Sequence, residues 1–129
     1  MKGERDQMGL ALLATPEDQE REFRELLAAL GVEPNQKPTS IWRRWWRWHC
    51  EHPEVMDYLV KLVREVKRRG FKRYGMQSLF ERLRWHFHIE KGIEDFKLNN
   101  DFASRYARAL MKHRPELEGF FEVRALKAE

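Results

Sequence analysis

The chain has a single cysteine, Cys50, among its 129 residues. One cysteine excludes an intramolecular disulfide, and without a CxxC pair the usual structural zinc sites are not expected. This cysteine usage favours a reducing compartment, so we expect a cytoplasmic protein. Long apolar runs are also missing. No stretch approaches the roughly 18 residues of a membrane-spanning helix, and the apolar run from Met8 to Ala14 is a poor signal peptide.

A catalytic or metal-binding signature is missing as well. The candidate metal ligands are His49, Cys50, His52, His86 and His88. The first and third lie three residues apart and could share an ion from one helix, whereas the last two, two residues apart, could not easily do so. A nuclease-like set of His88, Asn99 and His113 lacks the hairpin and the tighter spacing of such sites. We expect no metal, no cofactor and no enzymatic activity.

Basic charge is present in excess and is unevenly distributed. Residues 1–40 carry 5 Lys or Arg and 8 Asp or Glu, a formal charge of −3, whereas residues 41–129 carry 20 and 13, or +7. The segment from Arg43 to Arg73 alone has 10 basic and 4 acidic residues, or +6. Such a field favours polyanionic partners and accelerates association with them. The alternative is a solvated helix face that binds no ligand.

The first helix signal begins at Thr15 and Pro16, an N-cap followed by proline at the first helical position. Gly31 ends this helix. Residues 31–40 have the composition of a linker, and the sign of the charge changes there. We therefore predict an acidic helical appendage and linker over residues 1–40 and a basic domain over residues 41–129.

Ser40 is the predicted cap of a short helix with four tryptophans in seven residues. Three indoles share one face and three arginines project around the other side: Trp42, Trp45 and Trp46, with Arg43, Arg44 and Arg47. The indoles could anchor this helix to the domain. Alternatively, exposed tryptophan and arginine could stack on bases or contact a protein partner. A membrane-surface helix also fits the composition, but the element is short.

Further helices are predicted over residues 54–69, 76–90 and 102–113, with short strands near residues 96–98 and 120–126. Two short strands gain most by pairing with each other. The order helix, helix, strand, helix, strand resembles a winged helix-turn-helix, whose last helix lies in the DNA major groove. The predicted fold is mainly α, a compact helical domain with a small two-stranded sheet and an N-terminal helical appendage.

The helix over residues 102–113 is the predicted reading helix. Its side chains for DNA are Arg105, Arg108 and Lys112, with Asn100 and Ser104 near its N-terminus for hydrogen bonds to phosphate. A second group, the predicted phosphate-contacting patch, contains Lys67, Arg68, Arg69, Lys72 and Arg73. The helix dipole offers another reason for the cations at positions 67–69. It does not explain the cations at positions 72 and 73, which lie beyond the helix.

The C-terminal part of the chain also carries a recognisable string of residues. The string contains His52-Pro53, Gly70, Arg84-Trp85, residues 95–100 (Asp-Phe-Lys-Leu-Asn-Asn), Tyr106-Ala107-Arg108, Pro115, Gly119-Phe120-Phe121 and Arg124. In this string the segment from Pro53 to Arg124 resembles a family of small, mostly uncharacterised proteins encoded in phages and prophages. The resemblance implies a phage-type origin and a compact helical domain, and it implies no catalytic residue.

The leading functional hypothesis is a regulatory nucleic-acid-binding protein, with DNA as the expected partner and no membrane association. The alternative is a phage protein that binds and modulates a host protein, such as its transcription or defence machinery. In that case the N-terminal helix and the Trp-rich helix would form the partner-binding surface.

Overall fold

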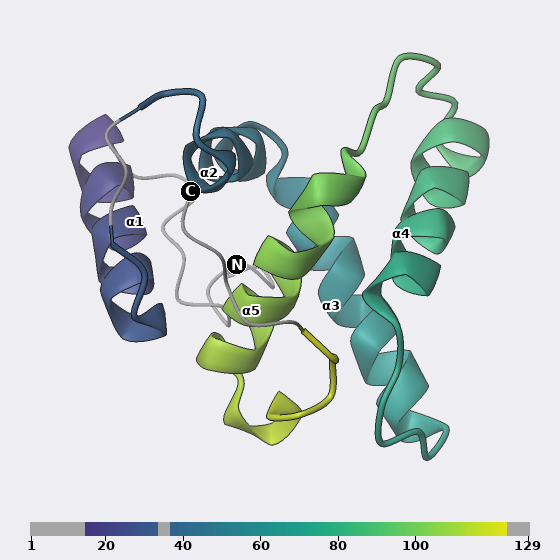
Figure 1. The fold of residues 1–129 in the computed structure, drawn as a ribbon. Coiled ribbons are helices and arrows are strands. Elements are labelled where there is room, and N and C mark those ends of the chain that lie inside the picture. Colours follow the sequence, from purple (N-terminus) through teal and green to yellow (C-terminus); the bar gives the residue numbers. More distant parts are fainter. Residues whose placement is uncertain (1–14, 34–36, 124–129) are drawn as a thin grey trace.

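The computed structural model describes residues 15–33 and 37–123. Within these ranges the chain forms α1 (Pro16–Leu30), α2 (Ile41–Glu51), α3 (Pro53–Arg68), α4 (Met76–Trp85) and α5 (Ala103–His113). Three short helical segments complete it: the π-helical turn η2 (His86–Glu90) and the 3-10 turns η3 (Asn100–Phe102) and η4 (Pro115–Leu117). In Figure 1, α5 lies at the centre, with α1 on one side and α4 on the other.

Local sequence signals set the helix ends. The Thr15 hydroxyl accepts a hydrogen bond from the Asp18 amide (3.1 Å), and the Ser40 hydroxyl accepts one from the Arg43 amide (3.3 Å). Each bond satisfies one of the amides that a helix N-terminus leaves without a partner. Gly31 ends α1 with φ of 74°, which L side chains rarely adopt. The predicted caps and the predicted stop of the first helix are confirmed.

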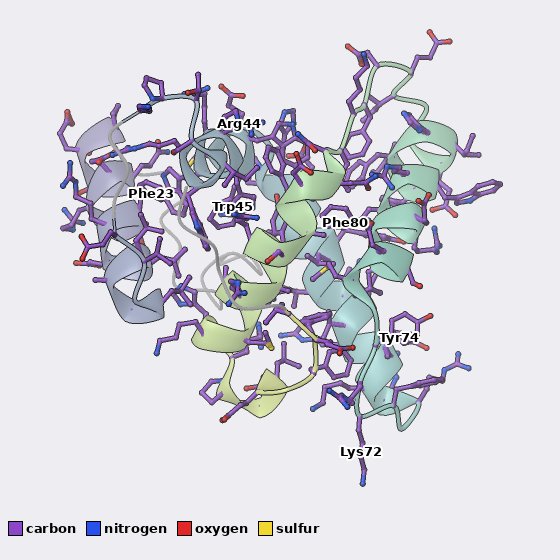
Figure 2. All side chains as sticks on the ribbon, viewed as in Figure 1. Phe23, Arg44, Trp45, Lys72, Tyr74 and Phe80 are labelled. Carbon is purple, nitrogen blue, oxygen red and sulfur yellow. The ribbon has the colours of Figure 1, made fainter. Side chains whose placement is uncertain are left out.

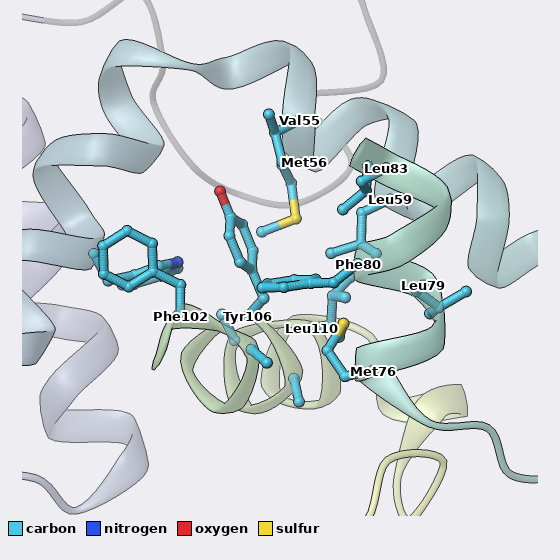
Figure 3. Packing of buried hydrophobic residues seen from close by; sticks show 14 of the residues in the cluster. Val55, Met56, Leu59, Met76, Leu79, Phe80, Leu83, Phe102, Tyr106 and Leu110 are labelled. Carbon is cyan, nitrogen blue, oxygen red and sulfur yellow. The ribbon is translucent and has the colours of Figure 1, made fainter. Parts of the chain in front are cut away.

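The core is one continuous cluster to which all five α-helices contribute. Figure 3 shows Tyr106 of α5 at its centre, between Phe102 and Phe80. The first helix belongs to this cluster, since the Phe23 ring lies 5.4 Å from that of Trp46. Helix α1 also contacts α5 directly. The predicted boundary between residues 40 and 41 therefore separates two helices that share one core.

The predicted two-stranded sheet, and with it the winged helix-turn-helix, is wrong for the described part of the chain. Residues 96–98 and 120–123 form no strand, and residues 124–126 lie outside the described ranges. Phe96 and Leu98 are both buried, so their alternation reflects an extended segment that packs on the core. Side chains replace the strand partner: Arg84 donates to the Leu98 carbonyl (2.7 Å) and His88 Nε2 to the Phe96 carbonyl (2.5 Å).

The predicted helix over residues 76–90 is one helical element that widens at its end. After α4 the chain continues through η2, where the Lys91 amide donates to the His86 carbonyl at 2.8 Å. The His86 ring stacks on Tyr58 of α3 at 3.7 Å and contacts Glu90 at 2.7 Å.

None of the described helices combines the length and the apolar character needed to cross a bilayer.

Candidate nucleic-acid interface

The predicted reading helix, α5, lies inside the molecule. Tyr106 and Leu110 are fully buried, and neighbouring helices cover much of the helix. The Arg105 guanidinium lies over the Trp42 ring, 5.3 Å from its centroid. Arg108 is partly buried and donates to the Ser104 hydroxyl (3.4 Å), and this burial lowers the pKa of its guanidinium. Of the three predicted reading cations, only Lys112 is exposed, whereas a recognition helix must project several side chains into a groove.

The polar residues at the start of α5 serve the fold. The Asn100 side-chain oxygen accepts a hydrogen bond from Arg84, the same guanidinium group that holds the Leu98 carbonyl. Ser104 is partly buried and bonded to Arg108. Both side chains are therefore engaged in hydrogen bonds within the chain.

The tryptophans of α2 form part of the core. Trp42, Trp45 and Trp46 are all buried. The Trp45 ring meets Tyr106 edge-on at 5.5 Å and stacks on His49 at 5.5 Å. Of the interpretations left open by the sequence, the anchor describes these three buried indoles, and an exposed binding surface does not.

The arginines of α2 contact other parts of the same chain. Arg43 donates two hydrogen bonds to the Glu20 carboxylate (2.7 and 2.9 Å), and its guanidinium lies 4.8 Å from the Phe23 ring centroid. The Arg43 hydrogen bonds lower the pKa of Glu20. Arg44 donates to the Thr39 carbonyl (3.0 Å) and Arg47 to the Pro38 carbonyl (3.4 Å). These residues fasten α2 to α1 and to the preceding turn, so the predicted arginine surface is engaged internally.

The second half of α3 and the loop that follows it form a basic end of the molecule. We define the basic end as Lys61, Arg64, Lys67, Arg68, Arg69, Lys72 and Arg73, all exposed. Seven cations face a single acid between positions 61 and 73, a formal charge of +6. That acid, Glu65, is shared by Arg68 and Arg69. Figure 2 shows Lys72 extending away from the ribbon.

Several cations of the basic end form no ion pair with any described residue. Within the described ranges, the side chains of Lys61, Lys72 and Arg73 form no hydrogen bond or ion pair. Unpaired surface cations cost little in water and remain available to an external anion. The residues of the predicted phosphate-contacting patch are thus all exposed, at the end of α3 and in the loop that follows it.

A small cavity joins the basic end to the C-terminus of α5. Its volume is about 50 Å³, and its lining is formed by Val60, Val63, Arg64, Lys67, Leu110, Arg114, Glu116 and Leu117. Lys67 crosses toward η4 and donates to the Glu116 carbonyl (3.1 Å). This volume is well below the roughly 300–1,000 Å³ of ordinary ligand pockets. It is too small for a nucleotide, so any polyanion must bind to the surrounding surface.

The candidates for metal binding and catalysis are dispersed or shielded. His49 is fully buried, and burial lowers its pKa to about 3, with a smaller contribution from His113. Burial raises the pKa of the Cys50 thiol to about 11, so the reactive thiolate is scarce at neutral pH. The His52 ring packs on Trp48, whereas the His49 ring stacks on Trp45, so the two imidazoles have different neighbours. No group of three potential ligands converges among the described residues.

Several large apolar side chains lie on the surface, and the sequence did not predict their exposure. Phe71 is 52% exposed, Trp85 55% and Ile89 59%. The available signal for Phe71 was its position after Gly70, outside any helical apolar stripe and between basic residues.

No protein-family model, curated protein or solved structure matches the chain. The resemblance to phage-encoded proteins stays a prediction.

Proposed function

We propose that this chain is a non-enzymatic, regulatory nucleic-acid-binding protein of the cytoplasm, with DNA as its partner. The interface is the basic end, with Lys112 as a further contact from α5. The observation that carries the proposal is the +6 formal charge between positions 61 and 73, on side chains that are all exposed. Phosphate contacts supply affinity through the release of condensed counterions, and they require cations that can reach the backbone of the strand.

The helix dipole accounts for only part of this charge. Cations in the last turn of α3, such as Lys67 and Arg68, complement the negative end of the helix. Lys72 and Arg73 follow the helix end and have no such role. Since they are exposed and have no ion-pair partner among the described residues, a polyanion is the partner that their chemistry fits.

The test is a titration of labelled single-stranded and duplex DNA by fluorescence anisotropy at several salt concentrations. We expect the affinity to fall steeply with salt. The double variant Lys72→Ala/Arg73→Ala should bind more weakly, and the slope of log affinity against log salt should become shallower by roughly one to two. The change should be similar for all sequences, because phosphate contacts carry no base information.

A matched control comes from another pair of exposed loop lysines. Lys91 and Lys97 lie beyond the far end of α4 and also form no side-chain ion pair within the described ranges. The variant Lys91→Ala/Lys97→Ala removes the same charge and should retain most of the affinity. Equal losses of DNA affinity in the two double variants would mean that only the net charge of the chain matters. If the wild-type chain shows no salt-dependent binding, the proposal is refuted.

The alternative hypothesis, binding of a host protein, stays a prediction. Helices α1 and α2, which were its proposed contact elements, direct their apolar faces into the core. For this reason we prefer the nucleic-acid hypothesis.

A further inference from the structure

An aromatic side chain stands within the basic end. Phe71 follows Gly70 directly and precedes Lys72 and Arg73, and 52% of its surface is exposed. A single exposed apolar residue is ordinary on a protein surface. This one differs because cations lie on both sides of it in the chain, from Arg68 and Arg69 on one side to Lys72 and Arg73 on the other.

The loop that carries Phe71 is held at both ends. The Phe71 amide donates to the Val66 carbonyl of α3 (3.3 Å), and Gly70 turns the chain with φ of 94°. On the other side, the Tyr74 amide donates to the Phe120 carbonyl (3.1 Å). The Tyr74 ring meets Phe71 nearly perpendicularly at 5.6 Å. The ring of Phe71 is therefore supported by the fold although half of its surface remains in water.

We propose that Phe71 is a stacking platform for an unpaired base and that the basic end prefers single-stranded over duplex DNA. This inference rests on the proposed function and names its substrate class. An aromatic face can stack on any base whose own face is open, while flanking cations hold the phosphates on either side of it. In a duplex, neighbouring base pairs cover the base faces, so Phe71 would add nothing there.

A second exposed aromatic residue supplies the contrast. Trp85 is 55% exposed, and ten helical residues from Met76 to Trp85 separate it from the loop, a rise of about 15 Å. The two arginines beside it on α4 are engaged: Arg82 pairs with Glu90 (3.5 Å), and Arg84 pairs with Glu81 (3.0 Å). Trp85 therefore has no unpaired cation directly adjacent to it in the sequence, as Phe71 has in Lys72.

The experiment compares four variants of the full chain on a short labelled oligodeoxythymidylate and on a duplex. Phe71→Ala should weaken single-strand binding about tenfold, the scale of one lost stacking contact. Its salt slope should be unchanged because no charge is removed. Phe71→Trp should retain the affinity, Phe71→Leu should not restore it, and Trp85→Ala should bind as the wild type does. Circular dichroism of each variant checks the fold.

Three results would overturn the stacking role while leaving the proposed function intact. These are wild-type affinity in Phe71→Ala, full affinity in Phe71→Leu, and equal losses on the single strand and the duplex. If the wild-type chain binds neither DNA in a salt-dependent manner, the proposed function fails together with this inference.

Discussion

Helix α2 and the basic end are two regions of similar composition with opposite surroundings. Both combine arginine with aromatic residues, and either could have been read as a binding surface. In α2 three of the four indoles are buried and Arg43 is bonded to Glu20, whereas Phe71 and Lys72 of the basic end are exposed. Figure 2 shows Trp45 pointing inward and Lys72 extending outward.

The comparison teaches that composition does not separate an anchor from an interface. An arginine beside an aromatic ring contributes to stability when a carboxylate of the same chain completes the contact, as Glu20 does for Arg43. Where the described residues offer no such carboxylate, as for Lys72 and Arg73, the cation remains available to a partner. The decisive observation is the counter-charge.

The largest expected effect is on stability. Trp45→Ala removes a fully buried indole that packs on Tyr106 and His49, and it should lower the free energy of unfolding by about 3–5 kcal/mol. Phe71→Ala should change it by less than about 0.5 kcal/mol, since the ring is half exposed. Urea denaturation of both variants measures the difference. Similar losses of unfolding free energy in the two variants would contradict the distinction between a buried α2 and an exposed basic end.

The next effect is a pH dependence that comes chiefly from His49 of α2. The His49 pKa is about 3 in the folded chain and about 6.5 when unfolded, so the unfolded state binds the proton first as the pH falls. Stability due to neutral His49 is thus complete above the unfolded value and is lost between about pH 6.5 and 3, on the order of 1 kcal/mol per pH unit.

His49→Phe keeps a ring at this position and removes the proton site. Its free energy of unfolding should fall less steeply with acid than that of the wild type, as measured by denaturation between pH 7 and 5. Burial also lowers the pKa of His113, so some acid sensitivity should remain in the variant. Parallel pH profiles for the wild type and the variant would contradict the assignment to His49.

The smallest expected effects concern one arginine from each region, Arg43 of α2 and Arg73 of the basic end. Arg43→Ala breaks a two-bond contact with Glu20 that is partly exposed, and it should cost about 1 kcal/mol of stability with little change in DNA affinity. Arg73→Ala should do the reverse, because its side chain has no partner in the described chain. Denaturation and anisotropy on the same two proteins give the comparison. A loss of DNA affinity in Arg43→Ala would mean that α2 also contacts the nucleic acid.

Sequence reasoning succeeded where the determinants are local. Thr15, Ser40 and Gly31 act on amides and carbonyls within a few residues, so the ends of α1 and the start of α2 could be predicted. It failed at Phe96 and Leu98, because alternating burial is shared by a paired strand and by an extended segment held by side chains. The partner of an extended segment is a tertiary choice that alternation does not reveal.

In the candidate site, too, some features followed from the sequence and others depended on the tertiary structure. The excess charge of the basic end could be read from composition, and the cations that carry it are exposed in the structure. The cations of α5 were misjudged because their spacing shows which residues share a face but not what covers that face. Arg105 lies over Trp42, a residue more than sixty positions earlier in the chain.

The sequence by itself determined the helices, the caps of α1 and of the start of α2, and the location of the excess basic charge, because these depend on neighbouring residues and on composition. Only the tertiary structure decided that α5 lies at the centre, that the indoles of α2 are core, and that Phe71 stays exposed among cations. Burial and ion pairing depend on which distant elements meet, and no local pattern encodes that choice.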